Sequence, residues 1–484
     1  MTKKSDLVAI IDIGSSSIRL VIFDEPRFSA NIIFNEKVTL ELGTEISEKL
    51  IKDDKIKSLL GVLRKFFKIS RSVKKNNLHI FASAALRIAK NSNLIVELVR
   101  TEFDHEIKIL TAEEEGVYSA MGVFFSHSKV NGIVGDFGGG SLEITSVNKS
   151  KKISFLESLT IGHVVLRKMG NFNDKKVRKY IFSSIQKIKK VDSKIFYAVG
   201  GSFRALAKLH ILLKKEDLKI IQDYEVDAQD FIRDLKDAFF NDCNVNFKLI
   251  SKASKSRMFI IPYAFYVLEN LIQKFNIKKI FFTNTGIREG FLYSLINKRQ
   301  ADPFLSQIRK IANRAIKKKD VLKLFDWIEP VNYYLKIDKK LLLSACWLTN
   351  IANSVHPEHR RVFALESVLY YPFYHLKRYD RYLLSLILYF RYSKNLKGEL
   401  AMSVSTRISY QELLKAKICG QLLRIAHHIT GRLDYNNLKS IQLKLDSKNN
   451  IIFPEPQKHY LLFGQSYERG VKNIKEVLKT LHSY

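Results

Sequence analysis

The sequence predicts two related α/β domains that face each other across a cleft, followed by a mostly helical domain. Three observations support this fold class. β-like runs alternate with helical stretches up to about residue 300, one short phrase occurs twice, and helical periodicity dominates from about residue 305. No low-complexity linker separates the parts, and we expect domains at residues 1–125, 126–302 and 303–484.

The repeated phrase reads IDIGSSSIRLVIFD at residues 11–24 and GDFGGGSLEIT at residues 135–145. The two copies align without a gap and share an aspartate (Asp12 and Asp136), a glycine two residues later and a serine three residues beyond it. A single copy could be an ordinary turn, because aspartate and glycine both favour turns. Two copies at the ends of β-like runs instead indicate two related half-domains.

The individual elements follow from local periodicity. In the first domain we expect strands at 7–11, 18–23, 31–42, 78–83 and 106–111 and a helix at 55–69. In the second domain we expect strands at 132–137, 142–147, 194–201 and 277–283. In the last domain we expect helices at 303–319, 340–355, 381–393 and 410–430 and a β-like pair within 441–454.

The chain carries 81 basic and 48 acidic residues, a formal net charge of +33. This excess favours polyanionic partners such as polyphosphate, nucleic acid or an anionic membrane surface. Lys, Ile, Asn and Phe are also abundant, as expected if an AT-rich genome biases its codons. The charge alone therefore does not identify a ligand.

Three distant cysteines, Cys243, Cys346 and Cys419, indicate a reducing compartment without a disulfide or zinc framework. An acid interrupts the N-terminal apolar run early, and the longest apolar stretches are far shorter than a membrane span. We expect a cytoplasmic protein that does not bind membranes.

A third glycine-rich turn, at Gly200, Gly201 and Ser202, follows a β-like run and opens a helix. The turn could need glycine only for close packing, but backbone N–H groups at a helix start also bind anions. Three such turns around one cleft would surround a phosphate group. Asp12 and Asp136 at the ends of facing strands would supply the oxygen ligands that suit Mg²⁺.

The segment ILTAEEEGVYSAMGV contains the candidate catalytic residue. Thr111 and Glu114 have the spacing of a capping box, and acids favour the first turn of a helix. We therefore interpret Glu113 and Glu114 as helix-start residues. Glu115 would lie at the cleft, where a carboxylate could orient and deprotonate a water for in-line attack on phosphorus.

Seven segments in this order carry a resemblance to a known family: IDIGSSSIRLVI, FASAALRIA, LTAEEEGVYSAMGV, IVGDFGGGSLEI, TIGHVV, AVGGSFRALA and TGIREGFLY. Residues 7 to about 300 resemble the exopolyphosphatase / guanosine pentaphosphate phosphatase family. The resemblance implies two actin-like, ribonuclease-H-like α/β domains. It also implies Mg²⁺-dependent hydrolysis of the terminal phosphate of polyphosphate or of the 5′-phosphate of guanosine pentaphosphate.

The resemblance also implies roles for individual residues. Glu115 matches the catalytic glutamate, and the metal-associated acids are Asp12, Asp136 and Glu143. The phosphate-binding residues are Gly14, Ser15, Ser16, Ser17, Arg87, Gly138, Gly139, Gly140, Ser141, Gly200, Gly201 and Ser202. The alternative for Arg87 is an ion pair with a surface acid.

The chain departs from the family pattern at two places. Ser16 replaces an asparagine, which changes one polar contact. Gly116 and Val117 replace Ala-Arg, which removes a basic neighbour of Glu115.

The C-terminal part is only weakly similar to the family's HD-like domain. Thr349 and Asn350 stand where a His-Asp pair would be, so we expect no HD chemistry and no bound transition metal. We assign His356 and His359 to surface or packing roles. His427 and His428 are adjacent and point to different helix faces. We expect this domain to supply basic surface and the contacts of a homodimer.

Exopolyphosphatase activity, with processive removal of terminal phosphate, is the function that the sequence favours. The alternatives are a guanosine pentaphosphate phosphohydrolase, a non-catalytic nucleotide- or nucleic-acid-binding relative, and a sugar-kinase relative. Retention of Asp12, Glu115 and Asp136 together favours an enzyme, because binding alone would not require Glu115.

Overall fold

The computed structural model describes residues 6–43, 46–47, 49–216, 218–240, 247–296, 302–312, 315–446, 451–453 and 464–483. The chain forms two compact units, Met1–Gln300 and Ala301–Tyr484. Cys346 and Cys419 are free and buried, and Cys243 lies outside the described residues.

The first unit begins with a five-stranded sheet in the order β3-β2-β1-β6-β7. Its strands are β1 (Val8–Ile13), β2 (Ser17–Phe23), β3 (Ile32–Thr39), β6 (Leu78–Ala82) and β7 (Ile107–Ile109). Strands β3, β2 and β1 are antiparallel neighbours, whereas β1, β6 and β7 run parallel. Helices α1 (Asp53–Ser70) and α3 (Ser92–Phe103) cover one face, where Leu59, Phe66 and Val99 join the sheet's buried aliphatic side chains.

The second sheet of the same unit has the order β10-β9-β8-β11-β13-β12. Its strands are β8 (Gly132–Phe137), β9 (Leu142–Val147), β10 (Ile153–Leu159), β11 (Ile195–Val199), β12 (Tyr224–Asp227) and β13 (Lys279–Phe282). Again three antiparallel strands are followed by two parallel ones, and β12 adds an antiparallel edge. The two sheets therefore repeat one topology, as the repeated phrase predicts.

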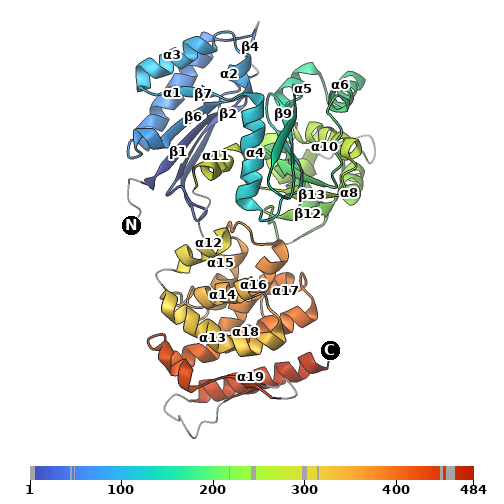
Figure 1. Cartoon of the computed structure of the whole chain (residues 1–484). Helices are drawn as coiled ribbons and strands as arrows, with labels where there is room; N and C mark the ends of the chain where they lie inside the picture. The colour runs from blue at the N-terminus through green and yellow to red at the C-terminus, as the bar shows by residue number, and fades with distance from the viewer. Residues whose placement is uncertain are drawn as a thin grey trace. The chain divides into compact units, whose positions relative to one another are not determined.

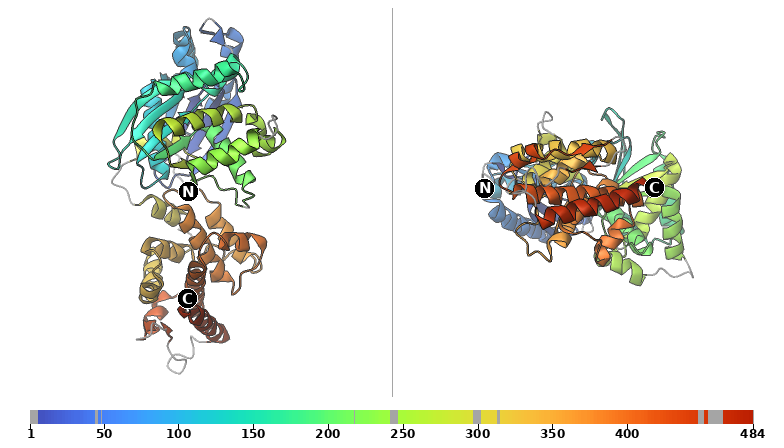
Figure 2. Two further views of the ribbon diagram at one scale, coloured as in Figure 1. Left: turned by 90° about the vertical axis from the view of Figure 1, so that its right-hand side faces the viewer. Right: turned by 90° about the horizontal axis from the view of Figure 1, so that it is seen from below.

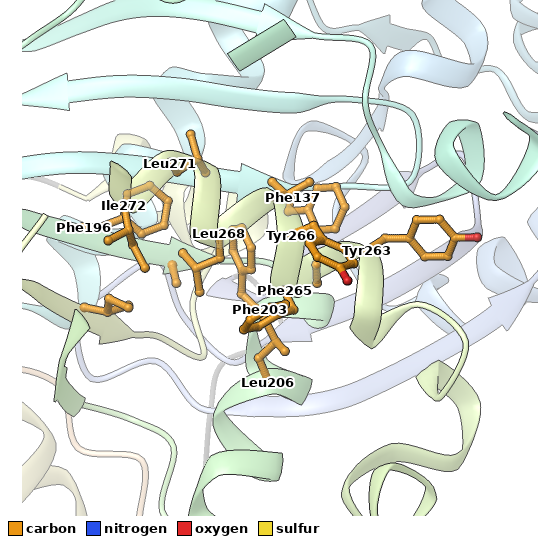
Figure 3. Close-up of a cluster of buried hydrophobic side chains, with 14 of the residues drawn as sticks. Phe137, Phe196, Phe203, Leu206, Tyr263, Phe265, Tyr266, Leu268, Leu271 and Ile272 are labelled. Atoms are coloured by element: carbon orange, nitrogen blue, oxygen red, sulfur yellow. The ribbon is translucent and has the colours of Figure 1, made fainter. Parts of the chain in front are cut away.

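The core of the second sheet is rich in aromatic side chains. Figure 3 shows Phe137 and Phe196 from the sheet packed with Phe203 from α7 (Gly201–Leu213) and Phe265 from α10 (Ile261–Phe275). The other helices around this sheet are α5 (His163–Met169), α6 (Lys175–Gln186), α8 (Ala228–Phe240) and α9 (Phe247–Ser254).

Helix α4 (Ala112–Ser126) connects the first sheet to the second and lies between them (Figure 1). It packs against α11 (Ile287–Leu295), which follows the second sheet, and Phe291 of α11 stacks edge-on against Phe81 of the first sheet. A Cβ atom on Gly290 would overlap the carbonyl oxygen of Tyr118 and lie 2.8 Å from the nitrogen of Gly122. Glycine at this crossing is therefore what allows the two helices to approach so closely.

The second unit is built from helices. They are α12 (Pro303–Ala312), α13 (Lys318–Leu335), α14 (Lys339–Leu348), α15 (Arg360–Leu369), α16 (Arg378–Tyr392), α17 (Glu399–Ser405), α18 (Tyr410–Thr430) and α19 (Gln465–His482). Helix α16 packs against α15 and α18, and α19 packs against α18 (Figure 2). The short pair β14 (Lys444–Leu445) and β15 (Ile451–Ile452) confirms the late β-like pair expected from the sequence.

The remaining short elements are α2 (Ala84–Ile88), β4 (Ile46–Ser47) and β5 (Leu50–Ile51). Each strand predicted from the sequence is present. Among the residues described, the structure contains no helix with the length and apolar character needed to cross a bilayer.

We expect Gly290→Ala to lower the free energy of unfolding by about 3 kcal/mol, because the added methyl group meets backbone that cannot move aside. Gly61→Ala is the matched control. Gly61 lies within α1 with no atom within 4 Å of its added Cβ, and alanine favours the helix by up to about 1 kcal/mol. Urea unfolding of both variants measures the difference, and equal effects would show that the α4–α11 crossing tolerates a side chain.

Candidate active site

A cleft of about 280 Å³ in the first unit is lined by residues from both sheets. Fourteen of the sixteen residues predicted from the sequence line it: Asp12, Gly14, Ser15, Ser16, Ser17, Glu115, Asp136, Gly138, Gly139, Gly140, Ser141, Gly200, Gly201 and Ser202. The two that do not are Arg87 and Glu143. The tertiary structure thus brings together three turns that are far apart in the sequence.

The two copies of the repeated phrase form the same tight turn. The backbone N–H of Gly14 donates to the carbonyl of Ser17 at 3.0 Å, and that of Gly138 donates to the carbonyl of Ser141 at 3.0 Å. The turns also meet, because a Cβ atom on Gly140 would lie 2.9 Å from Ser15 Oγ. Small residues are therefore needed both for the turns and for their contact.

The third turn has steric reasons for glycine, and anion binding by its N–H groups stays a prediction. Gly200 has φ of +104°, and its added Cβ would lie 2.8 Å from the carbonyl oxygen of Phe137, so a side chain is disfavoured. Gly201 begins α7 and leaves room for the guanidinium group of Arg257, which an added Cβ would approach to 2.6 Å. Glycine at this turn therefore allows close packing of the backbone and leaves space for a basic side chain of the cleft.

Glu115 lies in the first turn of α4, at the edge of the cleft. The capping box predicted from the sequence is confirmed: Glu114 N–H donates to Thr111 Oγ1 at 3.1 Å, and Thr111 N–H donates to Glu114 Oε2 at 3.0 Å. Glu113 is exposed, whereas Glu115 is 6% exposed. The helix start therefore holds one of three consecutive glutamates in the cleft.

Burial raises the pKa of Glu115 to about 7, and the charges of Asp136 and Asp12 act in the same direction. The guanidinium group of Arg87 opposes this rise, since its Nη1 donates to Glu115 Oε2 at 3.0 Å. A carboxyl group with a pKa near neutrality can accept a proton and release it again, as a general base must.

Arg87 and Glu143 lie behind Glu115 rather than on the cleft surface. Arg87 Nη1 also donates to the carbonyl of Leu110 at 2.8 Å, and its Nη2 lies 3.9 Å from Glu143 Oε1. Arg87 does form an ion pair, but its partner is the buried Glu115 rather than the surface acid of the alternative. Glu143 is 1% exposed, and burial together with the charge of Glu115 raises its pKa well above the usual value.

Gly116 has a steric reason to be glycine. An added Cβ would lie 2.9 Å from Thr145 Cγ2 and 3.2 Å from the ring of Phe155. The departure from the family pattern next to Glu115 therefore brings α4 close to the second sheet.

The two aspartates have the oxygen donors that suit Mg²⁺. Ser119 Oγ donates to Asp136 Oδ2, and Arg288 Nη1 donates to Asp12 Oδ2 at 2.7 Å. Within the described part of the chain, the second oxygen of each carboxylate accepts no hydrogen bond from the protein. Burial raises the pKa of Asp136, and the negative charge of Asp12 adds to this rise. A divalent cation beside both carboxylates would offset that repulsion.

Six basic side chains also line the cleft, against four acidic ones. The basic residues are Arg19, Lys37, Arg167, Arg204, Arg257 and Arg288. The pKa values of Arg19 and Lys37 are lowered first by burial and then by neighbouring arginines. Neither forms an ion pair with a residue that the structure describes. Unpaired cations that repel one another in a cleft favour an anionic ligand.

Sequence reasoning did not identify these cations. Three of them, Arg19, Arg204 and Arg288, lie within the segments that carried the family resemblance, but just outside the turns. The register between neighbouring strands would have located two of them. Arg19 lies opposite Asp12 across β1–β2, and Lys37 lies opposite Arg19 across β2–β3. Arg257 comes from a segment without a motif.

The second unit has an exposed group of two histidines and one glutamate. His356, Glu358 and His359 are exposed, and one ligand atom from each lies within 4.8 Å of the others. Their exposure agrees with the surface role expected from the sequence, and the expected lack of a bound transition metal stays a prediction. Thr349 and Asn350 are buried.

Family profiles match most of the chain. The profile of the Ppx/GppA phosphatase family matches residues 21–299, and the profile described as exopolyphosphatase, C-terminal, matches residues 336–477. The chain is 24% identical over 306 residues to a guanosine-5′-triphosphate,3′-diphosphate pyrophosphatase of Pseudoalteromonas atlantica. That alignment covers 61% of this chain and 59% of the relative, so the chain spans less than two thirds of the relative's length.

Solved structures match the first part of the chain. The Ppx/GppA phosphatase of Aquifex aeolicus has 24% identity and a TM-score of 0.51, covering 60% of this chain and 100% of that one. An exopolyphosphatase of Cytophaga hutchinsonii has 18% identity and a TM-score of 0.52, covering 60% and 97%. At these identities, the two structures establish the fold.

We expect the stability difference between the wild type and Glu115→Gln to depend on pH. The pKa of Glu115 is raised from 4.5 in the unfolded chain to about 7, so its contribution to stability is complete below pH 4.5 and is lost as pH rises through 7. The wild type should lose about 3 kcal/mol relative to the variant between pH 4.5 and pH 8. Denaturant unfolding across this range measures the difference.

Glu114→Gln is the control for this titration. The Lys108 ammonium lowers the pKa of Glu114, so this group's contribution changes only as pH falls below about 4.5. Its difference from the wild type should stay constant from pH 5 to pH 8. If the difference in free energy of unfolding between the wild type and Glu115→Gln were also constant over this pH range, it would contradict the raised pKa of Glu115.

Proposed function

The chain belongs to the Ppx/GppA phosphatase family, hydrolases with the actin-like ATPase fold, and from this premise we propose that it is an exopolyphosphatase. It would remove the terminal phosphate of inorganic polyphosphate processively. The observation that carries the proposal is the cleft itself, where a buried glutamate with a pKa near 7 faces glycine-rich turns and six basic side chains.

In this proposal Glu115 is the general base. Its carboxylate would accept a proton from a water that attacks the terminal phosphorus in line with the leaving chain. Arg87 would act as a positioning residue, because its guanidinium group fixes the orientation of the Glu115 carboxylate and limits the rise in its pKa. The N–H groups and hydroxyl groups of the three turns would bind the terminal phosphoryl oxygens.

Asp12 and Asp136 would hold Mg²⁺, whose charge would stabilise the phosphoryl oxygens. Arg288 orients Asp12 through its 2.7 Å hydrogen bond, and Ser119 orients Asp136. Glu143 is buried behind Glu115, its pKa is raised by burial and by the charge of Glu115, and it would not contact the substrate directly.

The lining of the cleft favours a phosphate polymer over a nucleotide. Lys37, Arg167 and Arg257 extend the positive lining beyond the turns, and Phe137 is the one Phe, Tyr or Trp among the described lining residues. A guanine base would gain from aromatic stacking, whereas a phosphate chain gains from repeated cations. Guanosine pentaphosphate is the second candidate, supported by the similarity to the guanosine-5′-triphosphate,3′-diphosphate pyrophosphatase of Pseudoalteromonas atlantica. The homodimer stays a prediction from the sequence.

We expect Glu115→Gln to lower kcat for polyphosphate by about 10²–10⁴-fold, because the amide cannot accept the proton of the attacking water. Polyphosphate affinity should change little, since the cations and turns remain. Glu114→Gln is the control, with helix stability rather than turnover affected, because its partners are Thr111 and Lys108. Phosphate release and equilibrium binding measure both properties. Activity within a few-fold of the wild type would exclude Glu115 as the base.

The dependence of KM on ionic strength should distinguish polyphosphate from guanosine pentaphosphate as the substrate. A long polyphosphate chain that contacts the extended positive lining displaces many counterions, so its KM should rise steeply with salt. Guanosine pentaphosphate and tripolyphosphate contact fewer cations and should show smaller slopes. The measurement is KM for the three substrates between low and physiological ionic strength at fixed free Mg²⁺. Equal slopes, together with a higher kcat/KM for guanosine pentaphosphate, would favour the second candidate.

A further inference from the structure

The second unit contains a buried cation without a counter-ion. Arg391, near the end of α16, is 3% exposed. Its Nε donates to Thr349 Oγ1 at 3.3 Å, and its Nη2 is buried without a hydrogen-bond partner. Among the residues described, no carboxylate forms an ion pair with Arg391. A buried charge is normally compensated by a partner, because its desolvation is costly.

Arg381, on the same helix, shows how this fold satisfies an arginine that has only a structural role. It is 2% exposed, and its Nη1 donates to the carbonyl oxygens of Val368 at 3.1 Å and Tyr371 at 2.6 Å. Its Nη2 donates to the carbonyl of Phe373 at 3.1 Å. The guanidinium group of Arg391 has no comparable set of acceptors. Backbone carbonyl groups therefore satisfy the hydrogen-bond donors of Arg381 but not those of Arg391.

The surroundings of Arg391 are positive. Burial is the main cause that lowers the pKa of Arg391 to about 10. The charges of Arg424 and Arg432 act in the same direction, and Tyr392 and Tyr435 oppose them. His427, one turn beyond Arg424 on α18, has a buried Nδ1 without a partner. Burial, followed by the charges of Arg391 and its neighbours, lowers the pKa of His427 to about 3. Arg391 of α16 and Arg424 of α18 thus bring two cations close to each other, and Arg391 Nη2 and His427 Nδ1 are buried nitrogens without a hydrogen-bond partner.

We propose that Arg391, Arg424 and His427 form an oxyanion site for phosphate, either free orthophosphate or the end of a phosphate chain. The planar guanidinium group of Arg391 matches the geometry of phosphate oxygens, and its buried, unpartnered Nη2 would be the donor to the anion. Arg424 is partly exposed and lies on the solvent side. The site belongs to the second unit and does not depend on the activity proposed for the cleft.

This site would be the electrostatic opposite of a metal centre. The buried hydroxyl of Thr349 accepts a hydrogen bond from a guanidinium group, and two arginines lie where a metal site would need several carboxylate or neutral histidine ligands. A phosphate dianion would neutralise the cluster that a metal cation would make worse.

Unfolding of the full chain tests the proposal in buffer without multivalent anions and with added orthophosphate or tripolyphosphate. All variants carry Glu115→Gln, which should slow turnover of tripolyphosphate, and phosphate binding at the cleft is common to all of them. Arg391→Met and Arg424→Gln remove members of the site. Arg407→Gln removes the same charge from an exposed position of the same unit and is the control.

Without multivalent anions, Arg391→Met should be at least as stable as its parent, because it removes an unpaired buried charge. Added phosphate should stabilise the parent and Arg407→Gln more than Arg391→Met. The apparent Kd at this site should be about tenfold weaker or more in Arg424→Gln, as expected for loss of one charge-assisted contact. Tighter binding of tripolyphosphate than of orthophosphate would identify the end of a chain as the ligand, and the reverse order would identify free phosphate.

Crystals of the full chain soaked in selenate locate the anion independently of stability. We expect an anomalous peak within hydrogen-bond distance of Arg391 Nη2, absent from Arg391→Met. A peak at the cleft alone, or the same response of all four variants to phosphate, would overturn the proposal.

Discussion

The close crossing of α4 and α11 is the constraint on which the catalytic arrangement depends. Helix α4 connects the two sheets and α11 follows the second sheet, and glycine at positions 122 and 290 lets their backbones approach within contact. The crossing fixes the first turn of α4, which holds Glu115, relative to the first turn of α11, which holds Arg288. A side chain at either glycine would separate the helices and move the proposed base away from Asp12 and Asp136.

Electrostatics then determine what the cleft can do. Three acidic groups, Glu115, Asp136 and Glu143, are buried close to one another, and each has a raised pKa because water is excluded. Arg87 lies between Glu115 and Glu143 and prevents a still larger rise for Glu115. The result is one carboxyl group that can exchange a proton near neutral pH, surrounded by cations that attract phosphate.

The large positive charge of the chain has at least two organised components. Six basic side chains line the cleft of the first unit, and a separate cluster around Arg391 lies within the second unit. In both places cations lie close to one another although repulsion costs energy, and burial increases that cost. Codon bias could raise the number of lysines on a solvated surface, but it gives no reason for arginines to converge in buried positions.

The sequence by itself determined the strands of two related half-domains, the capping box, the three glycine turns and fourteen of the residues in the cleft. These features are readable because each depends on neighbours within a few residues: strand alternation, a helix cap, a turn that needs glycine. Tertiary structure decided the rest. Arg87 and Glu143 lie behind Glu115, and Lys37, Arg257 and Arg391 acquire their importance only from groups distant in sequence. The physical reason is that burial and Coulomb interaction depend on distance in space, which local periodicity does not encode.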